Sequence, residues 1–470
     1  MPASITDPAK WFDFLQKHWH RRIALIGTLL FLTPFLILIM NFMKFNPVNG
    51  GLTYIIVVLF VILCWLRSNQ LPRTAKGKIG FVISISASDE AERIKIKEDF
   101  ITILYQLLKS GTSGHSFHII TVPEHIASTI VTHDDAQKLR IQCRAHFVIF
   151  GRVRLRTING KEEHVLDFEG MVAHRPVPID VKEFLSMEFT ELYPRRLRIG
   201  TENDVFSFEF TSEWMNCVAK YIIGIAAACS GDLDYAEILQ NDVLRLMEGR
   251  DQAFPVFAKL KQRVPIRLGE VRYERAKRAY GNWLTTRDPA DIAAMGNHLN
   301  SIPPAYAKEY QPIILKSIHL FLSKRDVNGA ISILKNYKNK SEGIWLFNMA
   351  FLNAYVGNLR TAIRQYRAAM KLKVDEHAPH DVEEFMRWLL EQEPDKYQFY
   401  YCLGFVSWKF RGDLARAISY LENFLSAGDT HDFETERQLA NSWIAEIRQT
   451  TPEHTDGGMK LDPYKTTPET

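Results

Sequence analysis

Two uncharged, apolar segments near the amino end constrain this chain more than any other feature. Residues 23–43 form a run of 21 without a charged side chain, and a helix of that length crosses a hydrocarbon core of about 30 Å. Residues 52–66 form a second run of 15, which is long enough only if its helix starts within residues 49–51 or the bilayer thins locally. The pair predicts a transmembrane hairpin over residues 23–66, with a re-entrant or interfacial second segment as the alternative.

The composition of the two spans predicts an anchor. Pro34 lies in the middle of the first span and should kink that helix. Tyr54 and Trp65 frame the second span, as aromatic residues do at membrane interfaces. Neither span contains Asp, Glu, Lys, Arg or His, which ion paths and proton relays normally need. Anchoring is therefore favoured over transport, although apolar hairpins of this kind also allow assembly into a homo-oligomer.

Basic residues around the spans predict the orientation. They precede the first span at Lys17, Arg21 and Arg22 and follow the second at Arg67, Arg73, Lys76 and Lys78, with only Lys44 in between. By the positive-inside rule, both termini are cytoplasmic and the connector is outside. The first run is too long for a signal peptide, begins too late and lacks a small-residue cleavage site. We expect a multi-pass protein of the plasma (inner) membrane with a cytoplasmic body.

The segments that flank the hairpin are basic. Residues 1–22 start with a helix signal at Asp7-Pro8 and then mix aromatic with basic residues. This mixture predicts an interfacial amphipathic helix, with a soluble lead-in helix as the alternative. Residues 67–77 read as a basic linker, and residues 450–470 are polar and Pro-rich and read as a disordered tail.

The rest of the composition excludes several classes of function. A net charge of +4 on 470 residues is close to neutral, so no nucleic acid partner is expected. The five cysteines (Cys64, Cys143, Cys217, Cys229 and Cys402) have no CxxC spacing, which indicates reduced thiols and no zinc site. His115 with His118, and the loop that holds His377 and His380, are weak metal candidates. No GxSxG or HExxH motif occurs, so we predict no enzyme, metal or cofactor.

Residues 78–210 predict a small α/β domain. Apolar runs at 78–84, 118–122 and 146–150 alternate with helical patterns at 91–110 and 134–144, which favours partly parallel strands. Asn159-Gly160 is a two-residue hairpin turn. This turn sets Arg152 opposite Asp167 and Arg156 opposite Glu163, as cross-strand ion pairs.

Three further features of this domain are candidate ligand groups. Arg152, Arg154 and Arg156 alternate along one strand and could meet an anionic ligand, although cross-strand pairing is the simpler interpretation. Ser86 and Ser88 follow the first strand, where open α/β sheets bind ligands. The loop at 111–114 is Gly-rich but follows a helix and lacks a Walker lysine, so it predicts no phosphate site. The basic patch at Arg195, Arg196 and Arg198 reads as a solvated turn, with contact to anionic lipid headgroups as the alternative.

Residues 400–425 predict two antiparallel helices hinged at Gly412-Asp413. Residues 346–370 repeat this arrangement with a turn at Gly357-Asn358, and residues 221–246 repeat it with a turn at Gly231-Asp232. Small residues should let the paired helices approach closely, at Gly224 with Ala236, Ala350 with Ala362, and Gly404 with Ala417. Ala330 and, more weakly, Ala293 look like the small residue of two further second helices. The 400–425 segment carries one extra residue before its turn.

This pattern of Gly, Ala and bulky residues resembles the tetratricopeptide repeat (TPR), and Ala330 to Ala362 is close to its period of about 34 residues. The resemblance implies an α-solenoid over residues 211–449 whose concave face binds a protein or peptide; an ordinary helical bundle is the alternative. The order of elements in 78–210, with the "FGRV" step at 150–153, resembles the amino-terminal module of bacterial TolB-type tetratricopeptide proteins.

The predicted fold class is a two-helix membrane hairpin, a small α/β domain and an all-α, TPR-like solenoid. The predicted function is a membrane-anchored cytoplasmic scaffold or adaptor that binds protein partners through the solenoid. The alternative is a signal-responsive membrane effector, in which the α/β domain senses a small anionic ligand and the hairpins cluster to perturb the membrane.

Overall fold

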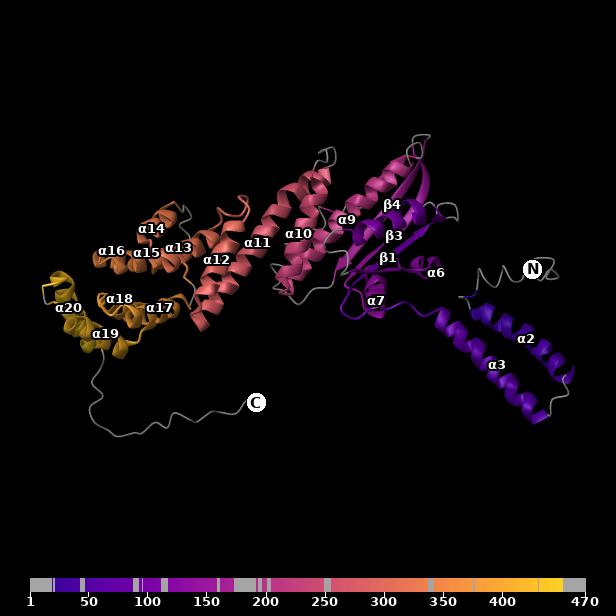
Figure 1. The fold of residues 1–470 in the computed structure, drawn as a ribbon, viewed down its shortest axis with the longest axis horizontal. Helices are drawn as coiled ribbons and strands as arrows, with labels where there is room; N and C mark the ends of the chain where they lie inside the picture. Colours follow the sequence, from indigo (N-terminus) through magenta and orange to yellow (C-terminus); the bar gives the residue numbers. More distant parts are fainter. Residues whose placement is uncertain are drawn as a thin grey trace. The chain divides into compact units, whose positions relative to one another are not determined.

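The computed structural model describes most of the chain, in fourteen segments. These are residues 19, 22–42, 47–87, 93–94, 96–110, 117–158, 161–172, 192, 197–200, 204–248, 255–336, 342–374, 377–429 and 431–450. The predicted helix before residue 19, the Asn159-Gly160 turn, the 111–114 loop, Ser88 and the tail from residue 451 lie outside the described residues. The chain forms two compact units, Met1–Val271 and Arg272–Thr470, whose elements are labelled in Figure 1.

Two apolar helices open the first unit, as predicted. They are α2, Arg22–Phe42, and α3, Pro47–Ser68, and both are long and apolar enough to cross a membrane. Helix α3 begins at Pro47, a residue suited to the first helical turn. It therefore includes residues 49–51 and reaches 22 residues, the length that the 15-residue apolar run lacked. Pro34 lies inside α2, and the kink there stays a prediction.

Polar groups of α2 and α3 find partners within the hairpin. The Thr33 and Tyr54 hydroxyls are 3.0 Å apart, so Tyr54 bonds to the neighbouring helix. The Trp65 indole donates to the Trp19 carbonyl at 2.7 Å, and the Trp19 indole donates to Ser68 Oγ at 2.9 Å. Two tryptophans thus meet at the end of α3, where interfacial residues are expected if the helices span a membrane.

A five-stranded sheet follows, in the order β2-β1-β3-β4-β5. Its strands are β1 Ile79–Ala87, β2 Phe117–Thr121, β3 Phe147–Ile158, β4 Lys161–Val172 and β5 Leu197–Gly200. Strand β1 pairs in parallel with β2 and β3, while β3, β4 and β5 are antiparallel. The parallel core and the β3–β4 hairpin were predicted. Strand β5 was missed, and Arg198 lies in it opposite Val165, so the interpretation as a turn was wrong for Arg198. Arg195 and Arg196 lie outside the described residues.

Helices cover both faces of the sheet (Figure 1). One face packs on η1 Ile96–Ile101, a π-helix, on α5 Thr102–Lys109 and on α9 Asp204–Cys229. The other face packs on α6 Glu124–Ala127 and α7 His133–Cys143. Helices α9 and α10 Leu233–Met247 share the first face's core, although they fall in the segment that resembles repeats. The first unit thus joins sheet and helices in one core.

The second unit is all helical over its described residues, apart from an isolated bridge at Glu342 and Lys373. Its elements after α11 Pro255–Thr286, which carries the boundary between the units, are α12 Pro289–Ser301, α13 Tyr310–Lys324, α14 Val327–Lys335, α15 Ile344–Tyr355, α16 Leu359–Ala369, α17 Ala378–Gln392, α18 Phe399–Val406, η4 Ser407–Arg411, α19 Leu414–Ser426 and α20 Glu434–Thr450. A core rich in aromatic residues runs through α13 to α20.

Turns between paired helices repeat one local design. A residue with positive φ is followed by an Asp that caps the next helix, at Gly231-Asp232, Arg287-Asp288, Arg325-Asp326 and Gly412-Asp413. The Asp carboxylate accepts a backbone N–H of the first helical turn, as in Asp413 with Arg416 N at 3.0 Å. The positive φ reverses the chain, and the cap starts the second helix at a fixed residue.

Candidate functional site

The six predicted packing residues lie in the seams between paired helices. Every one of them is buried, and the pairs are α9–α10 for Gly224 and Ala236, α15–α16 for Ala350 and Ala362, and α18–α19 for Gly404 and Ala417. A Cβ at Gly404 would lie 2.6 Å from Leu421 Cγ, and one at Gly224 would lie 2.7 Å from Gln240 Nε2. Glycine at both positions therefore sets how closely the helices approach.

The prediction that Ala293 is the small residue of a further second helix was wrong. Helix α12 buries Ile292, Met295 and Gly296, whereas Ala293 is exposed. Gly296 is the small residue that faces a neighbouring helix, because a Cβ there would collide with the His319 ring. The repeat spacing therefore pointed to the wrong small residue, because the side of α12 that packs on its neighbours carries Gly296 and not Ala293.

A cavity of about 230 Å³ lies within the second unit, among helices α11, α13, α15 and α17. Buried aromatic side chains of Phe321, Phe347 and Phe351 line it. Phe321 and Phe351 contact each other edge to face, with 5.1 Å between centroids, and Phe347 packs edge to face on Tyr366 and Phe410. The polar lining residues include His377 and Asp381 from the start of α17, and both are exposed. The site is an apolar pocket with a polar, acidic rim.

Polar groups in the pocket wall are mostly turned toward the helices. Asn348 Nδ2 donates to the Ile344 carbonyl at 3.0 Å, and Ser317 Oγ donates to the Ala330 carbonyl at 3.3 Å. Burial, aided by the Asp381 carboxylate, raises the pKa of Tyr280 to about 12, so this phenol stays neutral and can donate. The pocket therefore offers apolar contact inside and hydrogen bonding at its edge.

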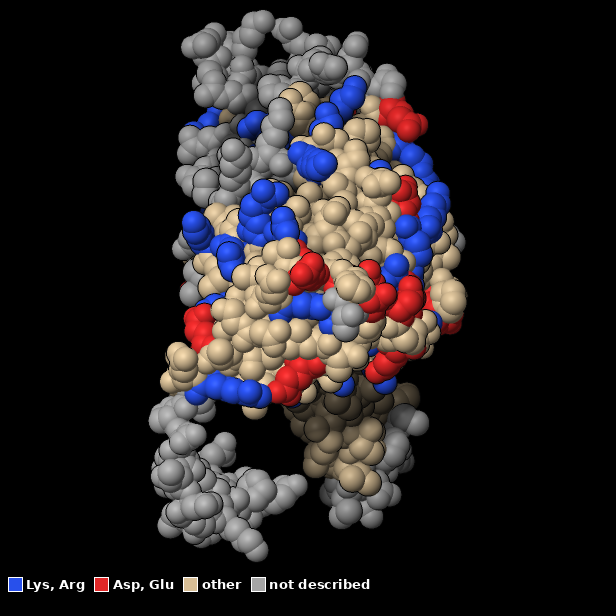
Figure 2. Space-filling model, turned by 90° about the vertical axis from the view of Figure 1, so that its left-hand side faces the viewer, with Lys and Arg blue, Asp and Glu red and all other residues tan. Residues whose placement is uncertain are grey.

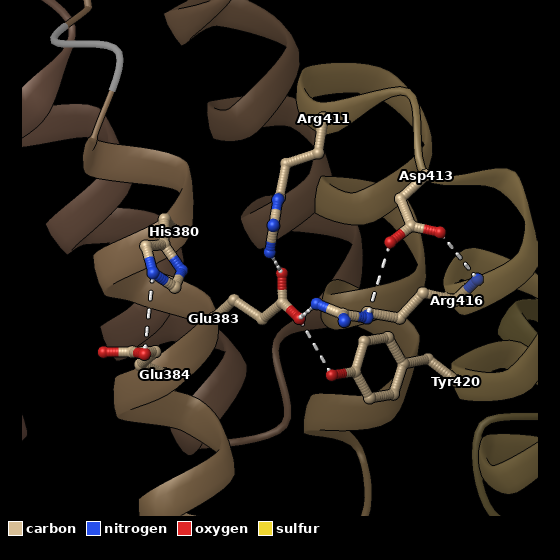
Figure 3. A network of polar contacts seen from close by, with 7 residues as sticks. All are labelled: His380, Glu383, Glu384, Arg411, Asp413, Arg416 and Tyr420. Atoms are coloured by element: carbon tan, nitrogen blue, oxygen red, sulfur yellow. Dashed lines mark hydrogen bonds and ion pairs between the residues drawn. The ribbon is translucent and has the colours of Figure 1, made fainter. Parts of the chain in front are cut away.

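A buried carboxylate joins α17 to the final helix pair (Figure 3). Glu383 is 2% exposed and accepts from Arg416 Nη1 at 3.1 Å and from Tyr420 Oη at 2.9 Å. Arg411 Nη1 donates to its other oxygen. Asp413 in turn pairs with Arg416 Nε at 3.4 Å. Two guanidinium groups and a phenol thus give one buried carboxylate hydrogen bonds on both of its oxygens, as a buried charged group requires.

The π-helix η4 explains how Arg411 reaches this site. One extra residue precedes the Gly412-Asp413 turn, and Ser407–Arg411 absorbs it as a wider helical turn. Asp413 N still bonds to the Ser407 carbonyl at 3.0 Å, so the turn closes normally. The insertion was visible in the sequence, but its consequence for Arg411 and Glu383 was not.

Arginine and lysine residues mark the exposed side of α16. Arg360, Arg364 and Arg367 follow one another at helical spacing, Lys371 lies two residues beyond the end of the helix, and all four are exposed. Arg360 Nε lies 3.1 Å from Glu436 Oε1, and Arg367 lies over the Phe405 ring, so two of the four serve packing within the unit. Figure 2 shows a face of the molecule on which basic residues (blue) and acidic residues (red) both lie among uncharged residues. This surface therefore carries no single-sign field.

The predicted hairpin register in the α/β domain is confirmed. Arg152 lies opposite Asp167 and Arg156 opposite Glu163. Arg152 and Arg154 line a hollow of about 290 Å³ together with Asp167 and Glu169, and Arg152 Nη2 also donates to the Ser128 carbonyl at 3.3 Å. Two carboxylates balance the two guanidinium groups, and the anion-binding role of Arg152, Arg154 and Arg156 stays a prediction.

Of the first metal candidate, His115 lies outside the described residues, and His118 Nδ1 accepts the Ala75 N–H at 3.2 Å. His377 and His380 lie at the start of α17, so the interpretation of this stretch as a loop was wrong. His380 Nε2 instead lies 3.5 Å from Glu384 Oε1, one helical turn away. Among the described residues, no group of three or more His, Cys, Asp or Glu could hold a metal ion.

No known family model matches the chain, and no curated protein is found to be similar to it.

Proposed function

We propose that this protein is a membrane-anchored cytoplasmic scaffold whose TPR-like helix pairs bind a protein or peptide partner. The repeated turns, the small residues in three helix seams and the aromatic core of the second unit support a repeat array. The apolar helices α2 and α3 support a membrane anchor, and the basic flanks support cytoplasmic termini.

The pocket among α11, α13, α15 and α17 is the observation that carries the proposal. Its volume of about 230 Å³ suits one bulky apolar side chain, and burying such a side chain contributes about 1.5–3 kcal/mol. Interfaces typically gain most of their affinity from a few such anchors in desolvated pockets. The exposed Asp381 at the rim favours a basic residue beside the anchor.

Site-specific photocrosslinking in membranes tests the proposal. A photoreactive phenylalanine analogue at Val382, which lines the pocket, should crosslink a protein partner. The same analogue at Met370, which is 46% exposed and does not line the pocket, is the matched control. A partner captured at both positions equally, or at neither, would contradict the assignment of the pocket.

A peptide built on the captured partner then identifies the anchor. Replacing its bulky apolar residue with alanine should weaken binding by about tenfold or more, the loss typical of an interface hot spot. Full affinity after every such replacement would show that the partner binds elsewhere on the unit.

A further inference from the structure

The segment that joins α3 to β1, residues 69–78, is fastened to the α/β domain. Thr74 donates from its N–H and from its Oγ1 to the Cys143 carbonyl, at 2.8 and 3.0 Å. Leu71 packs against the core of the sheet face that α6 and α7 cover. This linker segment is therefore bound to the carboxyl end of α7 and is no free tether.

The attachment limits the distance between the end of α3 and the carboxyl end of α7. Six residues lead from Ser68, the last residue of α3, to Thr74. A fully extended chain spans at most about 3.6 Å per residue, so these two residues lie within about 22 Å of each other. Because the two tryptophans near Ser68 mark the expected membrane interface, the end of α7 must lie close to one leaflet if α3 spans the membrane.

Basic side chains gather at this end of α7. Arg73 and Lys76 of the linker segment and Arg144, which follows α7, are exposed, and no ion pair joins any of the three to another described residue. The acidic residues Asp134 and Asp135 lie in the first turn of α7 instead. A helix of this length is about 16 Å long, about twice the Debye length of about 8 Å at physiological salt. The two carboxylates on α7 are therefore screened from a surface that the three cations contact.

An exposed isoleucine lies among the basic residues. Ile141 is 60% exposed and lies three residues after Lys138 and three before Arg144, so the three side chains are neighbours on one side of α7. Lys138 and Arg144 are exposed as well. Surfaces that lie at the level of lipid headgroups combine basic and apolar side chains in this way, because the cations meet phosphates while the apolar groups reach the acyl boundary.

We propose that the carboxyl end of α7 and the linker segment dock on the anionic lipid headgroups of the leaflet that α3 enters. Arg73, Lys76 and Arg144 contact the lipid phosphates, which attract basic side chains within a Debye length of the surface, and Ile141 enters between the headgroups. The proposal rests on the membrane anchor of the proposed function. It adds a fixed orientation of the α/β domain, with the amino ends of β1 and β3 toward the lipid, since His146 N there bonds to the Gly80 carbonyl at 2.8 Å.

Photocrosslinking to lipid tests the proposal. The full chain, with a photoreactive phenylalanine analogue at Ile141, is reconstituted in vesicles of phosphatidylcholine and phosphatidylglycerol. The same analogue at Val131 is the matched control, because Val131 is 57% exposed and precedes the other end of α7. Mass spectrometry should find phospholipid adducts several-fold more often at Ile141 than at Val131. In vesicles of phosphatidylcholine alone, the adducts at Ile141 should fall several-fold, because the anionic headgroups are missing.

Charge removal separates electrostatic docking from chance contact. The double variant Arg73→Gln with Arg144→Gln should lower the lipid adducts at Ile141 several-fold in the vesicles that contain phosphatidylglycerol. The double variant Lys316→Gln with Lys335→Gln removes the same charge from exposed positions of the second unit and should leave these adducts unchanged. Equal melting temperatures of the two variants establish that both are folded.

The analogue at Leu59 of α3, which is 53% exposed, distinguishes failure of the docking surface from failure of the anchor. Lipid adducts at Leu59 with none at Ile141 overturn the docking surface and leave the anchor standing. Lipid adducts at neither position contradict the anchor and the docking surface together. Equal lipid adducts at Ile141 and Val131, adducts at Ile141 that do not depend on phosphatidylglycerol, or a protein adduct in place of lipid at Ile141 each overturn the proposal.

Discussion

Lys220 of α9 and Asp242 of α10 form a buried ion pair, with Nζ and Oδ2 3.5 Å apart and neither side chain more than 3% exposed. Lys220 Nζ also donates to the carbonyl of Ser110, which ends α5, at 3.1 Å. A single ammonium group thus joins three helices around the core of the sheet. Burial lowers the pKa of Lys220 even though Asp242 opposes the shift, so desolvation outweighs the attraction.

Removing one partner of this pair should be costly. Asp242→Asn leaves a buried ammonium group without its counter-charge, and we expect the free energy of unfolding to fall by about 3–5 kcal/mol. The double variant Lys220→Met with Asp242→Leu removes both charges and should recover most of that loss. Denaturant titration of the full chain in detergent measures both. A double variant as unstable as Asp242→Asn would show that the pair is needed for more than charge balance.

The same pair predicts a pH dependence. The pKa of Lys220 in the folded protein lies below its ordinary value of 10.5, so between the two values the unfolded chain binds more protons. Stability contributed by this group therefore rises as the pH increases through that window. Relative to the Lys220→Met variant, the melting temperature of the unchanged protein should therefore rise as the pH increases through that alkaline window. Parallel curves would contradict the assignment.

Glycine at position 404 should be required for the last helix pair. Gly404→Ala places a Cβ 2.6 Å from Leu421 Cγ, and such overpacking costs about 1–3 kcal/mol. Gly281→Ala is the matched control, since nothing lies within 4 Å of its Cβ and alanine favours a helix by about 0.5–1 kcal/mol. Thermal unfolding should therefore move in opposite directions for the two variants. A stabilising Gly404→Ala would refute the close approach of α18 and α19.

Tyr420 reports on the carboxylate of Glu383. Burial and the nearby Glu383 charge raise the pKa of Tyr420 to about 12. Glu383→Gln removes the charge, so the pKa of Tyr420 should fall toward 10 without reaching it, because the phenol stays partly buried. The absorbance of tyrosinate, taken as a difference between each protein and its Tyr420→Phe variant, measures this shift. An unchanged pKa would show that Glu383 does not control the phenol.

The apolar hairpin of α2 and α3 should keep the protein in the membrane fraction of a cell extract. The full chain should stay with membranes after alkaline carbonate extraction, whereas a chain that starts at Gln70 should be released. Reporter fusions at the carboxyl end should be active only in the cytoplasm if the positive-inside rule holds. Release of the full chain by carbonate would contradict insertion of α2 and α3.

Local rules predicted much of the fold. Apolar run length located α2 and α3, strand and helix patterns located the parallel core, and Asn159-Gly160 set the β3–β4 register correctly. Gly-Asp and Gly-Asn pairs located the turns of three helix hairpins, because a glycine with positive φ is a local signal. The side chains of Asp232 and Asp413 also cap the next helix, whereas that of Asn358 does not.

Features that depend on distant residues were missed. Strand β5 exists through its pairing with β4, and its own sequence is basic and short. Glu383 looks like an ordinary exposed residue of an amphipathic helix until Arg411 and Arg416, about thirty positions later in the chain, cover it. The attachment of the linker segment to α7 likewise needs Thr74 to meet the Cys143 carbonyl, 69 positions later in the chain.

Filling the pocket among α11, α13, α15 and α17 is the most direct test of the scaffold account. Ile318→Trp places a large side chain in the pocket that Ile318 lines, whereas Met370→Trp adds the same side chain on an exposed position. The partner identified by crosslinking should bind the Met370→Trp protein with unchanged affinity and the Ile318→Trp protein at least about tenfold more weakly. Equal affinity for both variants, with both folded, would contradict the account.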